Sequence, residues 1–155
     1  MGNLQYRDSP VGRIGIAEDG GAVTHLFFEN EPAPEGFALA ETPLLRRAAT
    51  QLSEYFEGAR TAFELPLAPR GTEFQLSVWG ALREIPWGET RSYKDIAARV
   101  GKPRAYRAVG MANNRNPIAI IIPCHRVIGA GGDLVGYGGG LSTKRFLLEL
   151  ERRRA

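Results

Sequence analysis

The sequence has 155 residues, of which 43% are hydrophobic and 24% charged, as is typical of a soluble globular protein of one or two small domains. It contains no run of about 18 apolar residues, so we expect no transmembrane helix and no membrane partner. The first residues lack the charged and apolar segments of a signal peptide, and a single cysteine cannot form an internal disulfide. These features favour a cytoplasmic protein.

Charge divides the sequence into two halves. Residues 1–71 carry six Arg against ten Asp and Glu, a net charge of −4, whereas residues 72–155 carry fourteen Lys and Arg against seven Asp and Glu, a net charge of +7. An acidic half followed by a basic half indicates two modules, the second of which faces a polyanion. A basic half can also be no more than a well-solvated surface, so charge alone does not show that the second module binds a polyanion.

The first half has the pattern of a small α+β domain, which we place at residues 1–70. Two short apolar runs, residues 12–17 and 22–28, are separated by Asp-Gly-Gly and predict an antiparallel hairpin. After a loop rich in Pro and Glu, Thr42 and Pro43 are typical of a helix start, and apolar residues then recur at helical spacing. Nothing in this half suggests chemistry, and His25 is expected to be structural.

The second half, residues 71–155, follows a segment rich in Pro and Gly that we interpret as a linker. Thr72 and Gln75 form a capping-box pattern, and Ser92 and Asp95 form another, so each pair predicts a helix start. Gly101 can end the second of these helices, and Pro103 is expected to begin a third. Two short helices joined by such a tight turn predict a helix-turn-helix.

The third helix has two different faces. Its small residues recur at helical spacing on one side and would allow close approach to DNA, although some of them must face the core, whereas polar and charged residues share the opposite side. Such a face is often only solvated, but in a basic domain it is a candidate DNA-contacting surface. The small residues are Ala105, Ala108, Val109 and Ala112, and the opposite face carries Arg104, Arg107, Met111 and Asn114.

A run of five apolar residues, 118–122, predicts a buried strand that leads into Pro123 and Cys124. A buried cysteine is more often inert than catalytic. Here, however, Pro123 rigidifies the backbone that leads to Cys124. His125 and Arg126 place a base and a positive charge beside the sulfur, as formation of a thiolate requires.

Two other kinds of site are disfavoured. One cysteine and two histidines 100 residues apart lack the spacing of a zinc site, so we expect no metal. The glycine-rich residues 129–140 lack the ending of a phosphate-binding loop, and no cofactor motif precedes them. These glycines form either a flexible surface loop or a pocket wall where backbone approaches a planar base.

A final amphipathic helix is expected to begin near Ser142.

The string Ile122-Pro123-Cys124-His125-Arg126-Val127 resembles the active-site signature of the O6-alkylguanine-DNA alkyltransferases. The similarity runs over residues 74–151 and includes Ser92-Tyr93, Arg107-Ala108-Val109-Gly110, Asn116-Pro117 and the segment 136–141. The resemblance implies a ribonuclease H-like N-terminal domain and a winged helix-turn-helix C-terminal domain. It also implies single-turnover repair, in which an alkyl group moves from O6-alkylguanine, or O4-alkylthymine, in duplex DNA to Cys124 without a cofactor.

The resemblance assigns roles to the remaining residues. It implies that Cys124 is the acceptor, that His125 is its base through a water, and that Glu151 orients His125. Tyr93 would donate to the departing base, Lys144 would support that proton balance, and Asn116 would be a hinge. Arg107 would fill the stack that the flipped nucleotide vacates. Further DNA contacts are expected from Arg104, Ala108, Tyr93, Asn114, Arg115 and Arg126, and the pocket is expected from Met111, Val127, Leu134, Tyr137, Gly138 and Gly139.

Position 138 departs from the family pattern, because some relatives have a Ser there that can bond guanine O6. In this sequence only backbone N–H groups of the loop could donate a hydrogen bond to guanine O6. The range of alkyl groups that the protein accepts is therefore left open. Three alternatives stand beside repair: a module that flags lesions without removing them, a winged-helix transcription regulator, and a cysteine hydrolase. The first typically lacks the cysteine, the second leaves Cys124 unexplained, and the third needs an oxyanion hole. A monomer is expected.

Overall fold

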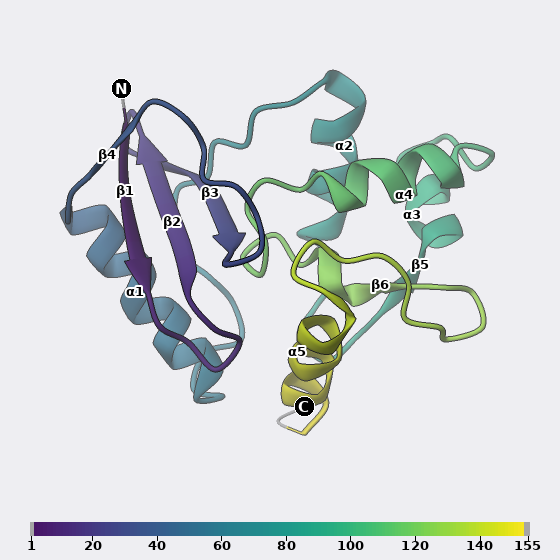
Figure 1. The fold of residues 1–155 in the computed structure, drawn as a ribbon. Helices are drawn as coiled ribbons and strands as arrows, with labels where there is room; N and C mark the ends of the chain where they lie inside the picture. Colours follow the sequence, from purple (N-terminus) through teal and green to yellow (C-terminus); the bar gives the residue numbers. More distant parts are fainter. Residues whose placement is uncertain (1, 154–155) are drawn as a thin grey trace.

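The computed structural model describes residues 2–153 and divides them between a sheet-containing N-terminal part and a mostly helical C-terminal part (Figure 1). This arrangement agrees with the α+β class predicted from the sequence. One hydrophobic core cluster includes side chains of both parts, so they pack against each other. Within residues 2–153, no helix is long and apolar enough to cross a membrane.

The N-terminal sheet has four strands in the order β3-β2-β1-β4. The strands β1 (Gly2–Arg7), β2 (Ile14–Asp19) and β3 (Ala22–Phe28) are antiparallel, as expected. The short strand β4 (Phe37–Leu39) pairs in parallel with β1, so the sheet predicted to be antiparallel has one parallel edge. The cause is the loop after β3, which carries the chain to the opposite edge of the sheet instead of turning back in a hairpin.

Local signals set the β2–β3 turn and the first helix. Gly20 and Gly21 both have positive φ, 62° and 84°, which a two-residue turn of a tight hairpin requires. The helix α1 (Pro43–Phe56) begins where the sequence predicts, with the Thr42 hydroxyl accepting from the backbone N–H of Leu45 at 3.2 Å. Its apolar face, which includes Leu45, covers the sheet (Figure 1).

The outer edge of β3 joins the two parts of the chain. Val23 exchanges backbone hydrogen bonds with residues 66–68, which were predicted to be a linker but lie against the strand instead. Three residues further on, Leu26 accepts from the N–H of Ala119 and donates to the carbonyl of Pro117. The segment that precedes Cys124 is therefore anchored on the N-terminal sheet.

The helices α2 (Glu73–Leu82) and α3 (Tyr93–Arg99) begin at the two predicted capping boxes, both of which are formed. Gly101 has the expected left-handed conformation after α3, with φ at 78°. The helix α4 (Tyr106–Asn114) begins later than predicted, at Tyr106. Pro103 lies inside a turn that the Ala105 N–H closes on the Lys102 carbonyl, a position that suits proline equally well.

A short parallel pair of strands connects the helices to the segment that carries the cysteine. The strand β5 (Arg91–Ser92), directly before α3, pairs with β6 (Val127–Ile128), directly after the helical turn η1 (Cys124–Arg126). The last helix, α5 (Leu141–Arg153), then packs beside η1. The start of α3, the cysteine turn and α5 are thereby brought together.

Candidate active site

The apolar run 118–122 is buried, as predicted, but it is not a strand. Asn116 holds it as a loop, because its side-chain amide donates to the Ile122 carbonyl at 2.8 Å and its oxygen accepts from the Ile118 N–H at 3.0 Å. At the centre of this run, a hydrogen bond from Ile121 N to Ala119 O closes a three-residue turn whose middle residue, Ile120, has a φ of 68°. A β-branched residue rarely adopts this conformation, which costs on the order of 1–3 kcal/mol.

Pro123 turns the chain once more before the cysteine. Its φ of −81° and ψ of 64° are those of an inverse γ-turn, and Cys124 N donates to Ile122 O across it at 2.8 Å. Proline is suited to this turn because its ring already restricts φ to this region. Two successive tight turns therefore present Cys124 at the start of η1.

The Cys124 side chain is nearly enclosed, with 5% of the residue exposed. Burial raises the pKa of its thiol to about 11, while the Asn116 amide and the Lys144 ammonium act in the opposite direction and the Glu31 carboxylate acts with burial. The free protein therefore holds this group as a thiol at neutral pH. A base is needed to remove its proton when it reacts.

Glu151 on α5 connects the predicted base to the rest of the core. One of its oxygens, Oε2, accepts from His125 Nε2 at 2.7 Å and from the Tyr55 hydroxyl at 2.6 Å. Both nitrogens Nε and Nη2 of Arg126 also donate to this carboxylate, at 2.8 and 3.0 Å. All of these groups are buried, and Glu151 is only 1% exposed. Although burial alone would raise the pKa of Glu151, the hydrogen bonds and charges of His125 and Arg126 lower it to about 2.

This network determines the state of His125. Burial, helped by the charges of Arg126 and Lys144, lowers the pKa of the imidazole although the Glu151 carboxylate raises it, so the ring is neutral at pH 7. An ionised carboxylate can only accept, so the single ring proton lies on Nε2 and the lone pair lies on Nδ1. Nδ1 has no hydrogen-bond partner among residues 2–153. The arrangement is that of a histidine able to take up a proton.

The prediction that Arg126 contacts DNA is wrong. Its guanidinium is buried, bound to Glu151 on one side and to the Ile85 carbonyl on the other, at 2.6 Å. The charge that the sequence places beside Cys124 therefore compensates the Glu151 carboxylate. Tyr55, which donates to the same carboxylate, was not predicted to belong to the site. The buried face of α1 carries two polar side chains, Gln51 and Tyr55, and nothing in the sequence singles out Tyr55 as a partner of Glu151.

Two further predicted residues, Tyr93 and Lys144, meet at one backbone carbonyl. The Tyr93 hydroxyl donates to Val135 O at 3.2 Å, and Lys144 Nζ donates to the same oxygen at 2.8 Å. Burial lowers the pKa of Lys144 to about 8, and burial and the Cys124 charge raise the pKa of Tyr93. Through their hydrogen bonds to Val135 O, both side chains hold the glycine-rich loop close to the thiol.

The predicted pocket residues differ in their surroundings. Tyr137 packs its ring on Phe28 and has a buried hydroxyl, whose pKa is raised well above the usual value first by burial and then by the Cys124 charge. Val127 is fully buried in the core, and Met111 is 62% exposed on α4, so neither lies open to an enclosed pocket. Leu134 is half-buried in the glycine-rich loop, where Gly138 and Gly139 also lie.

The outward face of α4 has the predicted composition. Val109 and Ala112 are buried, whereas Ala108 is exposed together with the polar residues on either side of it. The exposed face of α4 and its flanks therefore combines three arginines with small, polar and apolar side chains, which are Arg104 before the helix, Arg107, Ala108, Met111 and Asn114 on it, and Arg115 after it.

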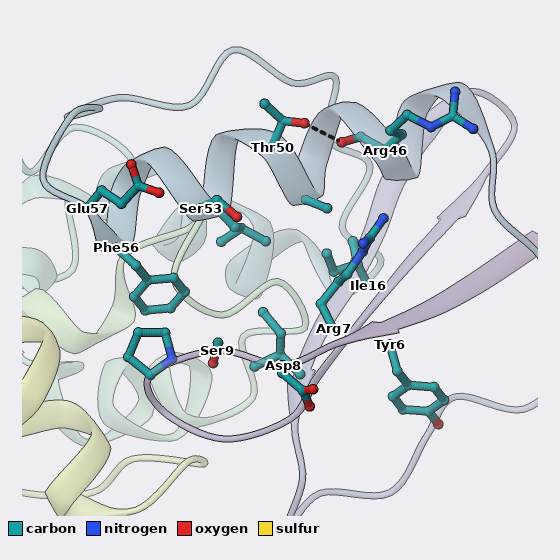
Figure 2. A pocket seen from close by; sticks show the side chains of 14 residues that line it. Tyr6, Arg7, Asp8, Ser9, Ile16, Arg46, Thr50, Ser53, Phe56 and Glu57 are labelled. Atoms are coloured by element: carbon teal, nitrogen blue, oxygen red, sulfur yellow. Dashed lines mark hydrogen bonds between the residues drawn. The ribbon is translucent and has the colours of Figure 1, made fainter.

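A groove of about 700 Å³ lies elsewhere, between α1 and the turn after β1 (Figure 2). Arg7 and Arg46 on its rim both pair with Glu41, and the Thr50 hydroxyl donates to the Arg46 carbonyl. None of the predicted site residues lines this groove, and it contains neither thiol nor imidazole. The chemistry suggested by the sequence lies instead at η1, the turn that carries Cys124 and His125. Among the described residues, no group of three or more His, Cys, Asp and Glu side chains could hold a metal ion.

Comparison with known families gives matches over both parts of the chain. Residues 4–69 match the ribonuclease-like domain of 6-O-methylguanine DNA methyltransferase, and residues 73–153 match the DNA binding domain of that family. The chain belongs to the 6-O-methylguanine DNA methyltransferase family. The predicted α+β fold, with a small sheet domain followed by a helical domain, is therefore confirmed.

Individual family members are similar over nearly their whole length. A methylated-DNA–protein-cysteine methyltransferase of Methanosarcina barkeri is 56% identical over 147 residues, which cover 93% of each chain. One from Mycobacterium leprae is 53% identical, covering 98% of this chain and 93% of the relative. The crystal structure of Mycobacterium tuberculosis OGT in complex with DNA superposes with a TM-score of 0.93 at 49% identity, covering 99% of this chain and 94% of that one.

Proposed function

We propose that this protein repairs duplex DNA by moving an alkyl group from O6-alkylguanine to Cys124, once per molecule. The observation that carries the proposal is a thiol held on the same helical turn as His125, which has its Nε2 proton bound by Glu151 and its Nδ1 lone pair unoccupied. Membership of the methyltransferase family and the similarity to a relative solved with DNA support the same reaction.

In the proposed reaction, the sulfur attacks the alkyl carbon on guanine O6. An S–C bond forms, the C–O6 bond breaks, and the electron pair of that bond passes to the guanine. The thiol proton moves to His125 Nδ1, through a bridging water as the family resemblance implies, and the guanine finally takes up a proton. The thioether product has no easy leaving group, so the protein is consumed and needs no cofactor.

Tyr93 and Lys144 are proposed to assist the departing guanine. Both are proton donors at Val135 O, beside the loop that contains Gly138. A base bound beside this loop would receive the Tyr93 hydrogen bond in place of Val135 O as negative charge develops on it. Asn116 is proposed to support the reaction indirectly, since it shapes the loop that positions the sulfur.

The target carbon is inside a duplex, so the nucleotide must be flipped out to reach a thiol that is only 5% exposed. We propose that α4 binds DNA through its exposed basic face and that Arg107 fills the vacated stack. Contacts to the phosphate backbone carry no sequence information, so little sequence preference is expected. One chain supplies every residue of the site, which favours a monomer, and a cytoplasmic location is proposed.

The test is a stoichiometric transfer experiment. The protein is incubated with a duplex that carries one O6-methylguanine, and its intact mass and peptides are then measured. We expect one methyl group per molecule, on the peptide that contains Cys124, and no gain for Cys124→Ser, which should still bind the duplex.

Two outcomes would overturn the proposal. Binding of the damaged duplex without any methyl gain would favour a module that flags lesions. Repeated turnover by substoichiometric protein would favour a hydrolase.

A further inference from the structure

A turn of the N-terminal part, residues 28–31, packs directly on the glycine-rich loop of the active site. The Asn30 side chain donates to the carbonyl of Gly138 at 2.9 Å, and the rings of Phe28 and Tyr137 lie 5.6 Å apart. A Cβ atom added at Gly139 would lie 2.8 Å from the Phe28 ring. The loop therefore needs glycine at this position because of the N-terminal part as well as any bound base.

Glu31 is the charged residue of this turn, and its position is fixed at both ends. Its backbone N–H donates to Phe28 O, and its carboxylate oxygen Oε1 accepts from Phe28 N, both at 3.0 Å. The other oxygen, Oε2, faces the loop. A Cβ added at Gly138 would lie only 2.6 Å from it, so the carboxylate fills the space that a side chain at position 138 would need.

The charge of Glu31 acts at the thiol. No Lys or Arg in the described part of the chain forms an ion pair with this carboxylate. Its negative charge adds to burial in raising the pKa of both Cys124 and Tyr137. The alkyl carbon must approach Cys124 for the S–C bond to form, and any charge carried on the alkyl group is therefore brought into the field of Glu31.

We propose that Glu31 is a specificity-determining residue that disfavours transfer of negatively charged alkyl groups relative to neutral groups of the same size. The inference rests on the alkyl transfer proposed above and concerns the choice of substrate at that same site. The bonds formed and broken are the same for every substrate, so only the charge of the group is discriminated. A carboxymethyl group is the simplest anionic case, and a carbamoylmethyl group is its neutral match in size and in the carbonyl beside the reacting carbon.

The experiment measures single-turnover rate constants on three duplexes that differ only in the O6 substituent, which is methyl, carbamoylmethyl or carboxymethyl. Glu31→Gln keeps an oxygen for Phe28 N but removes the charge. We expect it to raise the ratio of the carboxymethyl to the carbamoylmethyl rate constant about tenfold, as Coulomb's law gives for two like charges about 12 Å apart at an effective dielectric constant of about 20. The methyl and carbamoylmethyl rate constants should change little and by the same factor. Glu31→Asp, which keeps the charge, should leave the ratio near that of the unmodified protein.

Glu35→Gln is the matched control, because Glu35 is exposed in the same loop and its removal changes the net charge equally. It should leave the ratio unchanged. An unchanged ratio in Glu31→Gln, or an equal loss on all three duplexes, would overturn the assignment and leave Glu31 a structural residue. Failure of the unmodified protein to accept even a methyl group would instead refute the alkyl transfer itself.

Discussion

Replacing Glu151 by Gln tests how much the buried network around it contributes to stability. The carboxylate accepts from His125, Tyr55 and Arg126 and is 1% exposed. Its pKa is about 2 in the folded protein, against 4.5 for an unperturbed glutamate, and this difference corresponds to about 3 kcal/mol of folding free energy. Removing the charge also leaves the Arg126 guanidinium buried without its counter-ion. We expect Glu151→Gln to lose about 3–5 kcal/mol at pH 7.

The pH dependence follows from the direction of the shift. A carboxylate with a lowered pKa stabilises the fold fully above pH 4.5, and this contribution is lost as the pH falls toward 2. The difference between the unmodified protein and Glu151→Gln should therefore shrink by about half or more between pH 7 and pH 3.

Urea unfolding at the two pH values measures both quantities. Glu149→Gln on the exposed side of α5 is the control and should change stability by no more than about 0.5 kcal/mol. A loss below about 1 kcal/mol for Glu151→Gln at pH 7, or a difference that is the same at pH 3, would refute the reasoning.

Three further predictions concern the thiol, its supporting loop and the DNA face. Because burial raises the pKa of Cys124 to about 11, alkylation by iodoacetamide should become about tenfold faster per pH unit between pH 8 and 10, and a plateau by pH 8 would contradict this. Asn116→Ala leaves two buried backbone groups unpaired and should cost about 2 kcal/mol in urea unfolding, whereas Asn114→Ala, at an exposed position, should cost little. Arg107→Ala should weaken binding to a duplex with O6-methylguanine more than binding to undamaged DNA. Equal losses on both, or the same effect from Arg47→Ala on α1, would argue against insertion of Arg107 into the stack.

Three of the helix starts could be predicted from the sequence because their causes are local, whereas the start of α4 could not, because Pro103 suits a turn as well as a first helical position. Thr42, Thr72 and Ser92 each precede a helix, and each bonds a backbone N–H three residues ahead. The same holds for Gly101, where a left-handed residue ends a helix. Signals of this kind involve only neighbours within one turn, so tertiary packing did not override them.

Two predictions failed because side-chain hydrogen bonds that the residue pattern does not reveal decide the local structure. The apolar run 118–122 has the composition of a strand, but the Asn116 side chain satisfies its backbone groups in place of a partner strand. The family resemblance leads us to expect Arg126 at the DNA, yet its partner in the structure is Glu151, 25 residues away in the sequence. Neither hydrogen-bond pattern leaves a periodic trace in the sequence.

The candidate site shows the same division. The turn that carries Cys124 and His125 could be identified from a continuous motif. Tyr55 and Glu31 could not be assigned, because both come from the N-terminal part and reach the site only through the packing of that part on η1, α5 and the glycine-rich loop.

The edge of β3 has a consequence for the integrity of the molecule. A strand edge with free N–H and C=O groups can pair with another chain, and proteins avoid this by covering such edges. In this structure residues 66–68 cover one stretch of β3 at Val23, and residues 117–119 cover the next at Leu26. The second cover is the segment that leads to the reactive cysteine. Any strain or modification that separates this segment from the sheet would leave the backbone N–H and C=O groups of β3 unpaired. Loss of the active-site geometry and the onset of aggregation through this edge should therefore occur together.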